Sequence, residues 1–219
     1  MTRPARWWWL RHAPVPEAAG GRIHGRRDVP CDTSDAATFR ALADLLPDGA
    51  SAVVSPLDRT RQTFEALVEA GFRAVDTLLE PDFVEQSFGD WEGLSWPSMQ
   101  ALDPEAYAAF WLDPVRNAPP GGESFASQMR RTAAAIERLS PLLAGRDVLC
   151  VAHGGTIRAA VAHALALPPE AAMAIVVDTL SVTRLDRVED RLLSGAGGVW
   201  RVQCVNAAAR WPASPGVGD

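Results

Sequence analysis

Two histidines and two arginines in this sequence of 219 residues lie in the segments that follow short, largely apolar runs. Arg11 and His12 follow residues 6–10, Arg59 closes the polar segment that begins at Ser55, and His153 follows residues 147–152. If these runs are strands of an open α/β sheet, the side chains meet in one crevice, because ligands bind beyond the carboxyl ends of such strands. Two imidazoles and two guanidinium groups that clamp oxyanions are what a phosphoryl group requires.

Each piece taken alone has a simpler explanation. A short motif such as Arg11-His12 arises often by chance, and a lone histidine is usually a core or surface residue. Arg59 alone is typical of a surface residue at the start of a helix. Gly154 and Gly155 after His153 indicate by themselves only a tight backbone turn. Their common position after separate strands favours the joint interpretation.

Five ordered segments resemble the motifs of the histidine phosphatase superfamily, which includes the cofactor-dependent phosphoglycerate mutases. The resemblance covers residues 6 to about 185 and rests on these segments: Leu10-Arg-His-Ala13, Ser55-Pro-Leu-Asp-Arg-Thr-Arg-Gln-Thr63, Glu85-Gln-Ser-Phe-Gly-Asp-Trp-Glu-Gly93, Pro120-Gly-Gly-Glu-Ser124 and Val151-Ala-His-Gly-Gly155. It implies a phosphatase that needs no metal and no cofactor and that hydrolyses a small phosphomonoester through a phosphohistidine. The roles it implies are a nucleophile, His12, a proton donor, Glu85, and a phosphate-binding group made of Arg11, Arg59, His153 and Gly154.

The implied roles agree with simple electrostatics. A nucleophilic imidazole must be neutral at the attacking nitrogen, and Arg11 and Arg59 should lower the pKa of His12 because they disfavour a second positive charge. An alkoxide leaves poorly, so a carboxylic acid such as Glu85 should protonate it and then activate the hydrolytic water.

The loop from residue 21 to residue 30 resembles the substrate-side loop of the family. We therefore expect Arg22, His24 and Gly25 to contact an anionic substrate, and the alternative for each charged side chain is a solvated position at the rim. Ala13 and the run Pro14-Val15-Pro16 depart from the common pattern of Gly and a following Glu. The prolines reshape the loop that follows His12, which in the family pattern carries additional polar residues that bind phosphate, so we do not expect the full set of these secondary contacts.

Several functions remain as alternatives to a phosphatase acting on α-ribazole 5′-phosphate or a related metabolite, the substrate suggested by the Trp-Glu-Gly and Pro-Gly-Gly-Glu-Ser segments. One is a phosphotransferase of the phosphoglycerate mutase type, and another is a non-catalytic binder of phosphorylated ligands, because fold does not imply function. A third alternative is a metal hydrolase that uses the four histidines as ligands. The sequence argues against it, because it contains no HxH or HExxH motif. We predict that no metal is bound.

The elements that must position these residues alternate between strands and helices. We expect strands at 6–10, 52–54, 73–77, 147–152, 174–178, 180–185 and 198–205, and helices at 34–46, 58–70, 123–143 and 154–167. This order predicts an α/β fold with a mostly parallel central sheet and helices on both faces. Residues 80–122, with short helices at 96–102 and 104–112, should form an insertion over the C-terminal ends of the strands. Its Trp91, Trp96 and Trp111 are candidates for lining a pocket, whereas residues 7–9 should be core.

Length and composition favour one domain over residues 1–219 with a fraying tail at 212–219. The net charge of −6 argues against a nucleic-acid partner. No run approaches the ~20 apolar residues of a membrane span, and the apolar run near the N-terminus is too short for a signal peptide. Three widely spaced cysteines favour a reduced, cytoplasmic protein. The expected partner is a small phosphorylated metabolite; the oligomeric state stays open, with a homodimer among the options.

Overall fold

Strand β1 (Ala5–Arg11) lies inside the central sheet, between the parallel strand β4 and the antiparallel strand β5. The computed structural model describes residues 4–16, 21–188 and 199–209. In this part of the chain the sheet has the order β3-β2-β4-β1-β5-β6. The other strands are β2 (Ala50–Val54), β3 (Ala74–Leu79), β4 (Asp147–Ala152), β5 (Val182–Arg187) and β6 (Trp200–Ala207). The predicted α/β fold is confirmed: β1 to β4 are mutually parallel, and β5 pairs antiparallel with both of its neighbours, β1 and β6.

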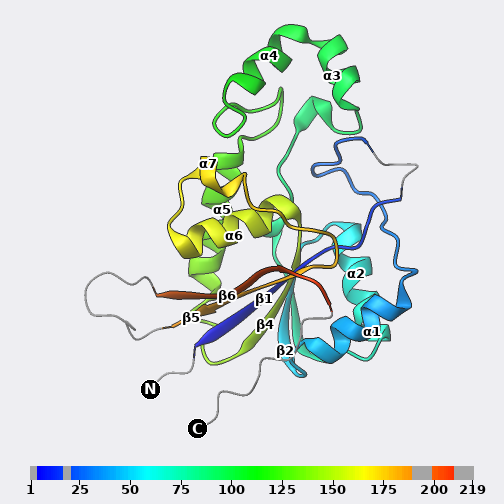
Figure 1. Cartoon of the computed structure of the whole chain (residues 1–219), viewed down its shortest axis with the longest axis vertical. Helices are drawn as coiled ribbons and strands as arrows, with labels where there is room; N and C mark the ends of the chain where they lie inside the picture. The colour runs from blue at the N-terminus through cyan, green and yellow to red at the C-terminus, as the bar shows by residue number, and fades with distance from the viewer. Residues whose placement is uncertain (1–3, 17–20, 189–198, 210–219) are drawn as a thin grey trace.

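Helices cover both faces of the sheet (Figure 1). One face packs against α1 (Ala36–Leu45) and α2 (Asp58–Glu69), and the other packs against α5 (Phe125–Leu139) and α6 (Gly154–Leu165). Strand β1 contributes side chains to the apolar core on both faces of the sheet, because successive side chains of a strand point to opposite faces.

The tryptophans of β1 are core residues, as predicted. Trp7 and Trp9 are buried and stack at 5.5 Å between ring centroids, and they pack in the same layer as Ile136 and Ile157. Leu10 and the partly buried Trp8 face the opposite layer. Because the strand is packed on both faces, the backbone position of Arg11, its last residue, is fixed.

The segment predicted as a strand at 174–178 is irregular and pairs with no other strand. It follows the short helix α7 (Pro169–Ala172). The carbonyls of Ile175 and Val177 accept hydrogen bonds from the side chains of Arg158 and Arg11, so arginines take the place of a neighbouring strand. Other boundaries differ slightly: α5 begins at Phe125 because the Ser124 hydroxyl caps it. The predicted tail at 212–219 lies outside the described residues.

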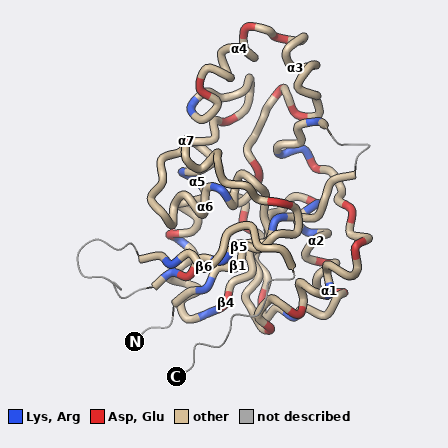
Figure 2. Tube along the Cα trace, viewed as in Figure 1, with Lys and Arg blue, Asp and Glu red and all other residues tan. Residues whose placement is uncertain are grey.

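Residues 80–122, called the covering segment below, stand above the carboxyl ends of the strands (Figure 1). The segment contains the single turns η2 (Pro81–Phe83) and η3 (Gly89–Trp91) and the predicted helices α3 (Trp96–Leu102) and α4 (Pro104–Leu112). The side chains of Ser95 and Asp103 cap these two helices. Acidic positions dominate the covering segment, whose single basic residue is Arg116, whereas both charges are interspersed in the described part of the chain below it (Figure 2).

A small apolar cluster of its own holds the covering segment together. Trp91, Met99 and Phe110 are its buried members. Trp91 was expected to line a pocket, and that prediction is wrong: its ring meets Phe110 edge-to-face at 5.3 Å inside the cluster. None of the helices in the described ranges is long and apolar enough to cross a membrane.

Candidate active site

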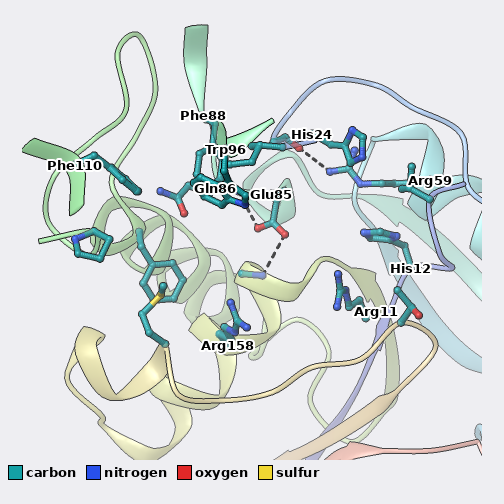
Figure 3. A pocket seen from close by; sticks show the side chains of 18 of the residues that line it. Arg11, His12, His24, Arg59, Glu85, Gln86, Phe88, Trp96, Phe110 and Arg158 are labelled. Atoms are coloured by element: carbon teal, nitrogen blue, oxygen red, sulfur yellow. Dashed lines mark hydrogen bonds between the residues drawn. The ribbon is translucent and has the colours of Figure 1, made fainter. Parts of the chain in front are cut away.

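A cavity of about 410 Å³ lies between the carboxyl ends of the strands and the covering segment. Arg11, His12, Arg59 and Glu85 line it, so most of the residues singled out by their position after strands do converge (Figure 3). Trp96 and Trp111 also line the cavity, as expected. The topology explains this convergence, because parallel strands bring their carboxyl ends to one edge of the sheet.

The ring of His12 is oriented by the backbone of the next residue. Its Nδ1 lies 2.7 Å from the carbonyl oxygen of Ala13. Because a carbonyl can only accept, Nδ1 carries the proton and Nε2 keeps its lone pair. The backbone N–H of His12 donates to the carbonyl of Ala152 at 3.0 Å and so extends the pairing of β1 with β4.

His12 is uncharged at neutral pH. Burial lowers its pKa to about 3, with further lowering by the charges of Arg59 and Arg11, while the hydrogen bond to Ala13 acts in the opposite direction. The predicted effect of the arginines is present, but burial is the larger cause. Burial also lowers the pKa of each guanidinium, and the charge of Glu85 opposes that shift. The site therefore combines a neutral imidazole with a buried cation, Arg59, and a partly buried one, Arg11.

Arg59 connects three segments of the chain from the first turn of α2. Its Nη2 donates to the carbonyl of Gly25 at 2.7 Å and its Nη1 to that of Arg27 at 3.0 Å, which ties the substrate-side loop to the sheet. Its Nε donates to Nδ1 of His153 at 3.2 Å. The side chain is almost fully buried, with 2% of the residue exposed. Arg59 thus organises the site in addition to contributing charge.

His153 lies behind the cavity wall, with its ring centroid 5.2 Å from that of His12. Because its Nδ1 accepts from Arg59, the proton of the neutral ring is on Nε2, which donates to the hydroxyl of Ser55 at 2.8 Å. Burial, and then the charge of Arg59, hold its pKa well below the ordinary range. Gly154, the next residue, packs close to Arg11: an added Cβ would lie 3.6 Å from the Arg11 Cζ.

The carboxylate of Glu85 is held against the first turn of α6. Its Oε2 accepts from the backbone N–H of Gly155 at 3.2 Å, and its Oε1 accepts from Gln128 Nε2 at 2.9 Å and from the N–H of Gln86 at 3.0 Å. Gly155 leaves room for the carboxylate in this position, because an added Cβ would lie 2.3 Å from Glu85 Oε1. A carboxyl group fixed in this way can exchange a proton with a group in the cavity.

The predicted substrate-side loop divides into two parts. His24 and Gly25 line the cavity. Arg22 is exposed and lies outside the lining, where its Nη1 donates to the carbonyl of Gly93 at 2.8 Å and joins the loop to the covering segment. Gly25 adopts a φ of +51°, and a Cβ there would lie 2.3 Å from a carboxylate oxygen of Glu92.

Sequence reasoning missed several polar residues of the site, among them Gln86, which lines the cavity, Gln128 on α5 and Arg158 on α6. Arg158 lines the cavity, and Gln128 is fully buried behind Glu85. Spacing was the available signal for Arg158, which follows Gly154 by four residues and so shares its helix face. Within the described ranges no group of three His, Cys, Asp or Glu side chains is placed to hold a metal ion.

The sequence profile of the histidine phosphatase superfamily (branch 1) matches residues 7–194, and the chain belongs to this family. The bifunctional protein Rv2228c of Mycobacterium tuberculosis is 35% identical over 153 residues, which are 68% of this chain and 41% of that protein. The metal-independent phosphoserine phosphatase of Arabidopsis thaliana is 30% identical over 154 residues, 68% of this chain and 64% of that protein. The chain thus spans about two fifths of the length of the first relative and under two thirds of the second.

The fold comparison agrees with the family. The crystal structure of the α-ribazole phosphatase from Shigella flexneri superposes with a TM-score of 0.77 at 22% identity, over 92% of this chain and 96% of that one. At this identity the likeness establishes the fold alone. The match to the family profile confirms the predicted family, and several relatives carry the names of phosphatases.

Proposed function

We propose that this protein is a metal-independent phosphatase that hydrolyses a small phosphomonoester through a phosphorylated His12. The observation that carries the proposal is the state of His12. The imidazole is neutral, its Nδ1–H is held by the Ala13 carbonyl, and its Nε2 lone pair is left for attack beside Arg11 and Arg59.

The first half-reaction transfers the phosphoryl group to the enzyme. Nε2 of His12 forms a bond to phosphorus as the P–O bond of the ester breaks, and the leaving oxygen takes a proton from Glu85. The two guanidinium groups neutralise the charge on the phosphoryl oxygens during transfer. In the second half-reaction the Glu85 carboxylate accepts a proton from water, the water oxygen attacks phosphorus, and the P–N bond breaks to release inorganic phosphate and neutral His12.

His153 and Gly154 complete the phosphate-binding group in this proposal. His153 holds the Arg59 guanidinium in place through Nδ1. A direct contact of its ring with a phosphoryl oxygen requires that it release Arg59 or Ser55. Arg22, by its place outside the lining, serves to anchor the loop, and His24 and Gly25 are the loop residues nearest to the substrate.

Hydrolysis rather than mutase activity is supported by the loop after His12. Val15, from the Pro14-Val15-Pro16 run, lines the cavity with an apolar side chain. A mutase needs polar residues that hold a second phosphate. α-Ribazole 5′-phosphate remains one predicted substrate among small phosphomonoesters. Incubation with 3-phosphoglycerate and catalytic 2,3-bisphosphoglycerate tests this point, since rapid formation of 2-phosphoglycerate without phosphate release favours the phosphotransferase.

The central experiment is a rapid quench during turnover of a radiolabelled phosphomonoester. We expect acid-labile, base-stable label on the wild-type protein and none on His12→Ala, which should also lose turnover. Label elsewhere, or full turnover by His12→Ala, overturns the mechanism. Binding of phosphorylated ligands without any turnover by the wild-type protein would identify the non-catalytic alternative.

A further inference from the structure

Arg158 brings a third guanidinium group into the cavity. It lies on α6, one helical turn after Gly154, and Figure 3 shows its side chain rising into the cavity beside that of Arg11. Its Nε donates to the carbonyl of Ile175 at 2.7 Å, which fixes the plane of the group. Among the described residues the structure gives it no other hydrogen bond and no carboxylate partner. The two Nη groups can therefore bind a ligand.

The charges that line the cavity leave Arg158 unmatched when a phosphomonoester is bound. Three arginines and one carboxylate, Glu85, are the Arg, Asp and Glu residues of the lining. A phosphate dianion matches Arg11 and Arg59, and Glu85 must be protonated to act as the acid. A partly buried guanidinium without a counter-charge is unfavourable. The cavity is thus complementary to one more negative charge on the substrate.

The rest of the cavity wall is apolar. Trp96, Phe110, Trp111, Phe125 and Met173 line it. Trp96 and Trp111 stand 5.3 Å apart between ring centroids and remain partly exposed, at 39% and 45%. Such a wall favours a ring or a hydrocarbon body over a strongly hydrated one, because apolar surface is removed from water when the ligand binds.

We infer that the substrate has an apolar or aromatic leaving group that carries a carboxylate, and that Arg158 binds this carboxylate. A guanidinium fork matches the two oxygens of a carboxylate with two parallel hydrogen bonds. The inference rests on the proposed function for its phosphoryl half and adds the chemical class of the other half. In this inference Arg158 determines substrate specificity. Its Nε is held by the Ile175 carbonyl, so that its two Nη groups face the cavity.

The test compares phenyl phosphate with 3- and 4-carboxyphenyl phosphate, which differ from it by one carboxylate. For the wild-type enzyme we expect kcat/KM to be about 10- to 100-fold higher for the better carboxylated ester, mainly through a lower KM. Arg158→Met should reduce this ratio toward one, and Arg158→Lys, which keeps the charge but not the fork, should retain part of it. Arg130→Met makes the same exchange at an exposed position of α5 and should keep the wild-type ratio.

Two results overturn the inference: no preference for the carboxylated esters in the wild-type enzyme, or equal losses on both types of ester in Arg158→Met and Arg158→Lys. A second measurement separates this outcome from a failure of the proposed function. Calorimetric binding of the same esters to His12→Ala, with and without Arg158→Met, reports the preference without turnover. If no ester is hydrolysed by the wild-type protein but the binding preference depends on Arg158, the proposed function fails and the carboxylate site stands.

Discussion

The Nε of Arg59 donates a hydrogen bond of 3.2 Å to Nδ1 of His153, so the guanidinium that lowers the pKa of His12 also fixes the second histidine of the site. Because the same side chain donates to the carbonyls of Gly25 and Arg27, one buried residue joins the sheet edge to the substrate-side loop. Replacement of Arg59 should therefore change both the charge of the site and the positions of His153 and the substrate-side loop.

Replacement of Arg59 by lysine should lower kcat/KM for p-nitrophenyl phosphate by about 10²- to 10³-fold, the usual cost of losing one preorganised donor to a developing anion. An ammonium group keeps the charge but cannot donate in the directions of the guanidinium fork. Arg61→Lys, on the same helix but partly exposed beside Asp58, is the control and should retain wild-type kinetics. Equal kinetics for both variants would contradict the role assigned to Arg59.

Glu85→Gln should slow the phosphorylation of His12 by an alkyl phosphate by roughly 10²- to 10⁴-fold, the range of general acid assistance. With p-nitrophenyl phosphate the loss should be much smaller, because a nitrophenolate leaves without a proton. Single-turnover kinetics isolate this step from the later activation of water. Glu92→Gln is the control: Glu92 accepts backbone N–H groups of Arg26 and Phe88 and does not line the cavity. A larger selective loss for Glu92→Gln would show that Glu92 is the acid.

Gly155→Ala should slow the same step although it replaces no titratable group. The new Cβ would lie 2.3 Å from Glu85 Oε1 and 2.7 Å from Gln128 Oε1, so the carboxylate must move. Gly154→Ala is the matched variant, since its Cβ would meet Arg11 at an ordinary 3.6 Å and its backbone N–H is kept. We expect a selective loss on alkyl phosphates for Gly155→Ala and a far smaller effect for Gly154→Ala. A larger loss for Gly154→Ala than for Gly155→Ala would contradict the role assigned to the contact between Glu85 and Gly155.

The buried His12 makes the folded protein less stable in mild acid. Its folded pKa of about 3 lies below the ordinary value of 6.5, so the unfolded chain takes up the proton first as the pH falls. The contribution is fully present above pH 6.5 and is lost as the pH falls toward 3; at pH 5 the loss amounts to about 2 kcal/mol of the free energy of unfolding. Urea unfolding at pH 7.5 and pH 5 should show a drop that is smaller by this amount in His12→Gln. An identical drop in both proteins would argue against a neutral His12.

Prolonged dialysis against EDTA should leave turnover unchanged, because the arginines supply the charge that Mg²⁺ or Zn²⁺ supplies at other phosphoryl-transfer sites. The measurement is the rate of phosphate release before and after dialysis, with and without added divalent metal. Activity that disappears and returns with a metal would favour the metal hydrolase.

The sequence was informative where local patterns decide the structure. Fully apolar runs predicted β1 and β4, and therefore the places of Arg11 and His12 at the sheet edge. The apolar run at 174–178 misled, because its carbonyls accept from Arg11 and Arg158, which come from distant segments. Gln128 gave no signal for a related reason, since its importance arises from contact with Glu85, 43 residues away.

The hydrogen bond between Nδ1 of His12 and the carbonyl of Ala13 also decides between two chemical isomers. Phosphohistidine exists with the phosphoryl group on either ring nitrogen, and the two forms differ in lifetime and in their phosphorus NMR signals. With Nδ1 pinned to its own backbone, only the τ-isomer, phosphorylated on Nε2, can form without breaking that bond. The regiochemistry of the proposed intermediate is thus set by a single peptide carbonyl before any substrate enters.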